Sequence, residues 1–509
     1  METRIAALAR LSLRFYNYCG GHFLPAHFRS AGGDNISSKV RRFVRTRRVG
    51  SDLQRDAYHR RCPPSDRRED AVRGEWAERL PERRPMKALT GLRFFAALLV
   101  VVSHFPQIIP INWFQVSLVR QGAAGVTIFF VLSGFVLTYN YADAFRTSTA
   151  GTLAFIRARI ARIWPINIVS LVIATLLSLW WGTSSSAATW VVNLLMLQAL
   201  VPTKAMVLSW NPPAWSVSCE LIFYCSFPIF CWVLGRVRCA SRFLQLGVAF
   251  FAIEVVLFCV VAVAVDQSLH QSGRSALEIW STMDRIKLFP GLRIWEFLLG
   301  CLIGLVFLHA RAGNDGWWRV LDRRHARDAM LAASALGLLA LFVLPLAVDL
   351  PERGLLALLM TVGQYLLYTP LAVLVVTALA WGPTTINPLL EQRWVLRFGE
   401  ASYSFYMLQF NAFLIATAIA GGAPLSVTPG WWLSAATIVV LALVSLATAR
   451  WIELPALQFL RGAAIRSSCS NAIAAGTVPT KAAPTQAESG KRTLWPKADA
   501  PIGRTDVRS

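Results

Sequence analysis

Uncharged, apolar stretches of about 20 residues recur along this chain from about residue 88 to residue 450. A helix needs roughly 20 predominantly apolar residues to cross the hydrocarbon core of a bilayer. Short polar loops separate the stretches. The pattern predicts ten transmembrane helices, at about 88–109, 122–141, 163–182, 215–235, 243–265, 289–308, 329–348, 355–381, 403–421 and 431–450.

The composition agrees with a membrane protein. Of the 509 residues, 55% are hydrophobic and only 16% are charged, whereas soluble chains carry about 25% charged residues. The mean hydropathy is +0.48. We therefore expect an all-α fold, a polytopic bundle of membrane helices.

The loops indicate how these helices are oriented. Four of them are basic: "FRTSTAGTLAFIRARIARIW", "GRVRCASR", "RVLDRRHARD" and "EQRWVLRFGE". Lys and Arg are retained on the cytoplasmic side of membrane proteins. If the N-terminus is cytoplasmic and ten helices alternate, all four basic loops and the Arg-bearing C-terminus fall on that side. We expect both termini in the cytoplasm.

One apolar segment, "AATWVVNLLMLQAL" (187–200), does not fit this alternation. It is too short to span a bilayer, and counting it as a span would invert every later helix. We interpret it as a short re-entrant or interfacial helix on the outer side.

The two ends of the chain differ from the apolar region. Residues 1–85 are Arg-rich and lack sustained periodicity, which favours a disordered cytoplasmic extension; alternatively, translation starts at Met86. Residues 86–462 form the membrane domain, and 463–509 read as a disordered cytoplasmic tail. The net charge of +23 is spread over these ends and the loops rather than one patch. This argues against nucleic-acid binding.

The nine cysteines are scattered, and the chain contains no CxxC motif. Most of them lie in apolar stretches, where a cysteine acts as a small buried hydrophobe. We expect no disulfide framework and no metal site.

Two ionisable residues in the first apolar stretch, Arg93 and His104, are the first candidates for chemistry. They are eleven positions apart, so on a helix they share one face and lie about 16 Å apart along the axis. An intramembrane charge is costly and must face a protein interior or a wet cavity. His104 is a candidate general base. The alternative is a structural histidine, hydrogen-bonded to a neighbouring helix.

Three further polar residues each have two possible roles. Arg159 and Arg162 share a helix face; they either mark the cytoplasmic side or grip the phosphate of a donor. Glu220 lies a turn and a half into the fourth predicted helix, at the expected depth of His104. It either orients the imidazole or reaches outer water.

Two polar groupings remain. We expect Arg293 and Glu296 to form a structural ion pair, because they are three residues apart on one helix, whereas Glu254 has no evident partner. Ser402, Tyr406 and Gln409 form a polar stripe near i, i+4 and i+7, which either lines a cavity or joins helices.

Taken in order, several motifs resemble the acyltransferase-3 family of integral membrane acyltransferases. They cover about 88 to 461 and are "LTGLRFFAALLVVVSHF", "GVTIFFVLSGFVLTY", "FIRARIARIWP", "PAWSVSCELIFY", "LRIWEFLLG", "FGEASYSFYMLQF" and "IELPALQFLR". The family's arginine–ten residues–histidine motif falls on Arg93 and His104. Its basic motif falls on Arg159, Arg162 and Pro165, and its Trp-Ser-x-Ser-x-Glu motif on Trp215, Ser216, Ser218 and Glu220.

The resemblance implies a function. It is transfer of an acyl group, usually acetyl, from acyl-CoA to a hydroxyl of a sugar in a surface polysaccharide, lipopolysaccharide or other glycoside. The expected location is the bacterial inner membrane, with acyl-CoA as co-substrate and no bound cofactor or metal. The partners are then acyl-CoA, a glycan or glycolipid acceptor and the lipid bilayer. The sequence carries no signal for an oligomeric state.

The resemblance also implies roles for individual residues. His104, Glu220 and Arg93 would be catalytic, and Arg93, Arg159 and Arg162 would bind the donor. The acceptor-pocket candidates are Trp215, Ser216, Ser218, Tyr406 and Gln409.

The sequence departs from the family pattern at three positions. Thr90 replaces a common Asp, Leu221 a second acid, and Gln409 a frequent His. These departures bear on the identity of the acceptor more than on the reaction.

A function of a different class also fits the intramembrane residues. A transporter or flippase for a glycan or small substrate displays Arg, His and Glu inside the membrane in the same way. Many carriers, however, have internal repeats and matched pairs of broken helices, which we do not find in this sequence.

Overall fold

The computed structural model describes residues 85–105, 112–145, 151–182, 186–201, 203–237, 240–271, 288–313, 316–347, 355–420, 430–456 and 458. The predictions for 1–84 and 463–509 lie outside these residues. The long helices are α4 (Lys87–His104), α5 (Asn112–Phe145), α6 (Thr152–Trp180), α9 (Trp215–Leu234), α10 (Ala240–Gln271), α12 (Pro290–Arg311), α13 (Arg324–Ala347), α14 (Leu355–Trp381), α17 (Ser402–Ile419) and α18 (Trp431–Thr448).

Each of the ten predicted spans coincides with one of these long helices. Eight of the described helices are long and apolar enough to cross a membrane, and the described part of α14 adds a shorter apolar helix at Tyr365–Trp381. The described residues contain no strand. The chain is a polytopic helical membrane protein. Ten crossings and cytoplasmic termini stay predictions.

Short elements lie between the long helices or, in the case of η5, after the last of them. They are α7 (Ala187–Leu194), η2 (Gln198–Leu200), α8 (Lys204–Val207), η3 (Pro212–Ala214), η4 (Trp317–Asp322), α15 (Asn387–Leu390), α16 (Arg393–Glu400) and a π-helix, η5 (Ala449–Glu453).

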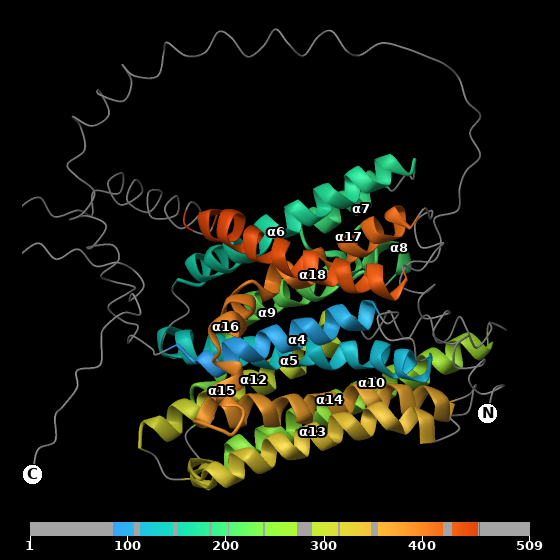
Figure 1. The fold of residues 1–509 in the computed structure, drawn as a ribbon. Coiled ribbons are helices and arrows are strands. Elements are labelled where there is room, and N and C mark those ends of the chain that lie inside the picture. The colour runs from blue at the N-terminus through green and yellow to red at the C-terminus, as the bar shows by residue number, and fades with distance from the viewer. Residues whose placement is uncertain are drawn as a thin grey trace, which may run out of the picture. The chain divides into compact units, whose positions relative to one another are not determined.

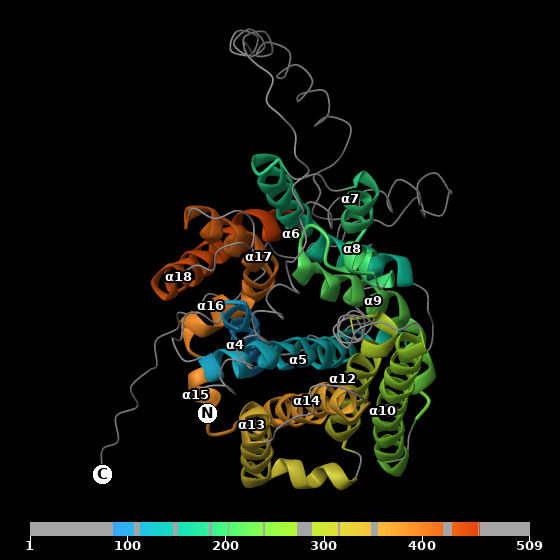
Figure 2. The same ribbon diagram turned by 90° about the vertical axis from the view of Figure 1, so that its right-hand side faces the viewer.

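Helices α4 and α5 lie in the middle of the bundle (Figures 1 and 2), between α6, α17 and α18 on one side and α12, α13 and α14 on the other. Helix α5 packs along both α4 and α12. Glycines permit the close approach to α12, since a Cβ on Gly134 would lie 2.0 Å from the Phe297 oxygen and one on Gly300 2.0 Å from the Val131 oxygen. Small residues at such crossings are typical of membrane helices.

Helices α4 and α17 run side by side in the same direction. Near their beginnings, a Cβ on Gly399, just before α17, would lie 2.1 Å from the Thr90 oxygen. Further along both helices, the rings of Phe105, just after α4, and Phe413 of α17 lie 5.4 Å apart. Residues of α17 can therefore be assigned a depth relative to α4.

The segment from Ala187 to Ala214, which contains the predicted re-entrant helix, packs into the bundle instead of forming a span. Its first helix, α7, has only eight residues, and the three residues of η3 are all buried. Polar side chains of α6 hold it, because Trp164 Nε1 donates to the Leu194 oxygen at 2.9 Å and Asn167 Nδ2 to the Asn193 oxygen at 3.0 Å. Irregular backbone at membrane depth is tolerated when protein buries it in this way.

The structure confirms the predicted Arg293–Glu296 ion pair, with Nη1 and Oε1 2.9 Å apart and both side chains buried. It also supplies a partner for Glu254, which accepts a 3.0 Å hydrogen bond from Thr369 on α14. The described residues contain no cluster of metal-ligating side chains.

Candidate active site

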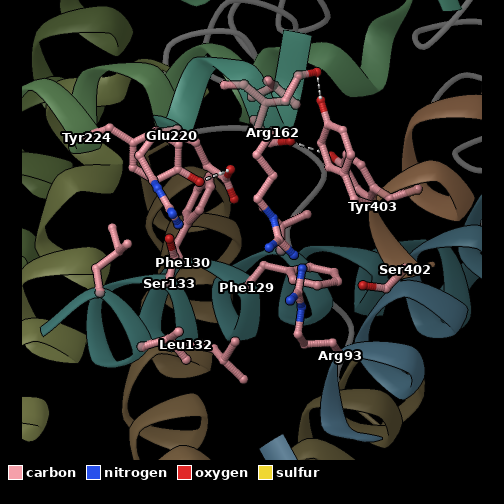
Figure 3. A pocket seen from close by; sticks show the side chains of 18 residues that line it. Arg93, Phe129, Phe130, Leu132, Ser133, Arg162, Glu220, Tyr224, Ser402 and Tyr403 are labelled. Carbon is pink, nitrogen blue, oxygen red and sulfur yellow. Dashed lines mark hydrogen bonds between the residues drawn. The ribbon is translucent and has the colours of Figure 1, made fainter. Parts of the chain in front are cut away.

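A cavity of about 120 Å³ lies where α4, α5, α6, α9 and α17 meet. It is lined by Arg93, Val126, Phe129, Phe130, Leu132, Ser133, Val136, Leu137, Arg159, Arg162, Ile163, Ser216, Val217, Glu220, Tyr224, Ser402, Tyr403 and Tyr406. Figure 3 shows its polar residues pointing inward from opposite walls.

The three arginines predicted to bind a donor all line this cavity. Arg93 comes from α4, whereas Arg159 and Arg162 come from one face of α6. In Figure 3 the side chains of Arg93 and Arg162 extend toward each other from opposite sides. Arg159 Nη2 donates to the Tyr141 hydroxyl at 2.9 Å, and its guanidinium carbon lies 5.2 Å from the centre of that ring.

Arg93 and Arg162 are not neutralised by direct contact. Among the described residues, neither forms an ion pair with a carboxylate. Two guanidinium groups that face each other across a cavity create a strongly positive space. Because a guanidinium presents its donors in a rigid fork, such a space is suited to a phosphate or another anion.

Glu220 is the acidic residue in the lining of the cavity. It accepts a 2.7 Å hydrogen bond from the Tyr224 hydroxyl, one turn further along α9. It is also within electrostatic reach of Arg93, Arg162 and Arg159. Glu220 therefore compensates part of the positive charge of the cavity.

The predicted pairing of Glu220 with His104 is not found. Glu220 lies with Arg93 in the cavity, whereas His104 is at the far end of α4 and is not one of the lining residues. The predicted depth of Glu220 requires a helix that begins at the membrane surface. Instead η3 is buried before α9 begins, and Asn211 donates a 3.0 Å hydrogen bond to the Met407 oxygen of α17. Helix α9 therefore starts inside the bundle.

His104 is half-buried and ends α4. Its Nδ1 lies 2.8 Å from the Val100 oxygen. Because a carbonyl only accepts hydrogen bonds, Nδ1 carries the hydrogen when the ring is neutral, which leaves the lone pair on Nε2. The ring is thus in the tautomer that a base acting through Nε2 requires.

The five acceptor-pocket candidates divide into two groups. Ser216 and Tyr406 line the cavity, and the Ser216 hydroxyl donates to the Tyr406 hydroxyl at 2.8 Å. Trp215, Ser218 and Gln409 do not line it.

These three residues have other surroundings. The ring of Trp215 lies 6.0 Å from that of Phe130, and Ser218 accepts a 3.2 Å hydrogen bond from the Ala199 nitrogen. Gln409 is buried, and neither polar atom of its amide has a hydrogen-bond partner among the residues that the structure describes.

Three polar residues of the site were missed in the sequence. Tyr224 follows Glu220 at i+4 in "ELIFY", a spacing that places both on one helix face and was a usable signal. Tyr403 lines the cavity and donates to the Ile163 oxygen at 2.6 Å. Ser133 comes from α5, where its small side chain sits in an otherwise apolar run.

Comparisons with known proteins match this chain to acyltransferases. The family model of the acyltransferase-3 type, described as an acyltransferase domain, matches residues 86–450. A curated relative, "Acyltransferase MdmB" of Streptomyces mycarofaciens, is 29% identical over 373 residues, which cover 71% of this chain and 87% of the relative. No solved structure shows a significant match.

Proposed function

The chain belongs to the acyltransferase-3 family, and we propose that it is an acyl-CoA-dependent O-acyltransferase. We propose that the transferred acyl group is acetyl. The acceptor is a hydroxyl of a sugar in a surface polysaccharide, lipopolysaccharide or other glycoside. The location we propose is the bacterial inner membrane. The observation that carries the proposal is the convergence of Arg93, Arg159 and Arg162 on one cavity.

The arginine cavity is the proposed binding site for the phosphates of the donor. Coenzyme A is a polyanion, and charge-assisted hydrogen bonds from guanidinium groups to phosphate are among the strongest that side chains make. Arg93 and Arg162 have no ion-pair partner among the described carboxylates, so they remain available to an anion. Glu220 limits the excess positive charge and, with Tyr224, shapes one wall.

The thioester end of the donor is proposed to reach toward His104. Arg93 and His104 are eleven positions apart, which corresponds to about 16 Å along α4, a gap that an extended pantetheine arm is long enough to bridge. The phosphates then stay at the arginines while the reacting carbon lies deeper in the membrane.

His104 is the proposed general base. Nε2 removes the proton of the acceptor hydroxyl as that oxygen forms a bond to the acyl carbon, and the carbon–sulfur bond breaks. The sulfur leaves as a thiolate and takes the proton from the imidazolium. The hydrogen bond from Nδ1 to Val100 holds the ring in the required tautomer throughout.

Turnover of acetyl-CoA by the purified protein tests this proposal. Release of the CoA thiol is measured with and without glycan acceptors, for the parent, for His104→Ala and for Arg236→Ala. Arg236 is exposed and stacks on Trp232, so it serves as the control. We expect the parent and the control to turn over, and His104→Ala to lose about 100-fold or more.

Two results would contradict the proposal. Full turnover by a folded His104→Ala protein would assign that residue to structure. Substrate export by the parent without any acyl transfer would instead favour a carrier.

A further inference from the structure

One face of α17 runs from the arginine cavity toward the far end of α4. Positions 402, 406, 409 and 413 fall within about 60° of one another on this helix. Ser402 and Tyr406 line the cavity, and the ring of Phe413 lies 5.4 Å from that of Phe105. Gln409 stands between them on the same face, so its side chain leaves the helix between the two parts of the proposed site.

The register of α17 against α4 gives the depth of Gln409. Contacts join position 399 to position 90 and position 413 to position 105, offsets of 309 and 308. Gln409 is therefore level with position 100 or 101 of α4, between Arg93 and His104. Along the helix axis it lies about 11 Å beyond Arg93 and about 5 Å short of His104.

The amide of Gln409 lacks the hydrogen bonds that a buried amide requires. The side chain is fully buried, and neither Oε1 nor Nε2 has a partner among the described residues. Burying an amide without hydrogen bonds is unfavourable, because the amide gives up its hydrogen bonds to water. Such a group in a folded protein therefore calls for a functional explanation.

The hydroxyl of Ser402 has the same property at the cavity end of this face. It is fully buried and has no partner among the residues that the structure describes. Figure 3 shows Ser402 pointing into the cavity that contains Arg93. The face thus presents two unsatisfied polar groups, seven positions apart, along the route between the arginines and His104.

The chemistry of the two groups indicates the ligand that completes them. A glutamine amide donates through Nε2 and accepts through Oε1, and a secondary amide offers the complementary carbonyl and N–H. The pantetheine arm of CoA carries two secondary amides between its pyrophosphate and its sulfur. With the phosphates at the arginines and the sulfur near His104, the amide-bearing part of the arm passes Gln409.

We propose that Gln409 binds the pantetheine arm of the donor, with Nε2 donating to an amide oxygen of the arm and Oε1 accepting from an amide N–H. This inference rests on the proposed function. It assigns Gln409 to the donor instead of the acceptor pocket that the family resemblance implies. The Ser402 hydroxyl donates to the phosphates at the other end of the same face.

The experiment compares two ligands that differ by the arm alone. They are CoA and adenosine 3′-phosphate 5′-diphosphate, which has the phosphates of CoA but no pantetheine. Dissociation constants are measured for the purified full-length parent and for Gln409→Met, Ser402→Ala and Gln392→Met. Methionine keeps the length of glutamine without its amide. Gln392 is the matched control, because it is exposed and does not line the cavity.

We expect Gln409→Met to weaken CoA binding about 10-fold or more, the factor for losing two neutral hydrogen bonds, and to bind the armless ligand like the parent. Ser402→Ala weakens the binding of both ligands by a similar factor, and Gln392→Met binds both like the parent.

Thermal unfolding without ligand separates this role from a structural one. Gln409→Met replaces an unpaired buried amide with an apolar group of similar shape, so the variant should be at least as stable as the parent. A glutamine that joins helices would instead give a lower unfolding temperature when it is replaced.

Three results would overturn the role of Gln409 and leave the proposed function standing. One is equal CoA affinity of the parent and Gln409→Met, and another is an equal loss of affinity for both ligands. The third is a raised KM for a glycan acceptor with unchanged CoA affinity, which would place Gln409 in the acceptor pocket. If the parent itself does not bind CoA, the proposed donor is wrong, and the inference falls with it.

Discussion

Replacing Arg293 with methionine tests the reasoning about buried charge in this bundle. Arg293 pairs with Glu296 at 2.9 Å, and its side chain is 4% exposed while that of Glu296 is fully buried. Arg293 Nη2 also lies 3.2 Å from the Thr127 hydroxyl of α5. The Arg293–Glu296 pair on α12 is therefore linked to Thr127 on α5 by a hydrogen bond.

The expected cost follows from what the substitution leaves behind. Arg293→Met keeps most of the side-chain volume but leaves Glu296 as a buried, unpaired carboxylate. Breaking a buried ion pair on one side costs about 3–5 kcal/mol, a large share of the roughly 5–15 kcal/mol by which proteins are stable. The double variant Arg293→Met/Glu296→Gln removes both charges and recovers most of the loss.

Equilibrium unfolding in mixed micelles, followed by tryptophan fluorescence, measures these differences. The control is Arg324→Met, because Arg324 pairs with Asp328 at 3.5 Å at an exposed position and such pairs contribute about 1 kcal/mol or less. A loss for Arg293→Met no larger than that of the control would refute the reasoning. So would a double variant that is no more stable than the single one.

Two further substitutions test the packing and the site. Gly300→Ala would place a Cβ 2.0 Å from the Val131 oxygen, so we expect a lower thermal unfolding temperature. Gly363→Ala is the control and should not lose stability, because its Cβ would meet no described atom within 4 Å. Tyr224→Phe removes the 2.7 Å hydrogen bond to Glu220, so turnover of acetyl-CoA by the folded variant should fall about 10-fold. Unchanged turnover would show that the reaction does not need this hydrogen bond.

The positions of the helices could be predicted from the sequence because they depend on local pattern. Long apolar runs coincide with the long helices, and the shortness of 187–200 distinguishes it from a span. The Arg293–Glu296 pair was also predictable, since both residues lie on one helix at a fixed spacing. Likewise Arg159 and Arg162 share a face through helix geometry alone.

The composition of the site depends on contacts between distant segments and could be predicted only in part. Arg93 and Glu220 line the same cavity because η3 is buried before α9 begins, a feature that no local pattern encodes. Ser218 was chosen by its motif, but its hydroxyl accepts from the Ala199 nitrogen of the inserted segment.

The central claim is that the arginine cavity binds the phosphates of a CoA donor, and the direct measurement is CoA affinity for the parent and for Arg162→Ala. Losing one guanidinium–phosphate contact should weaken binding about 10- to 100-fold, and Arg236→Ala, at an exposed arginine outside the cavity, should bind like the parent. Equal affinity of the parent and a folded Arg162→Ala protein would contradict the account.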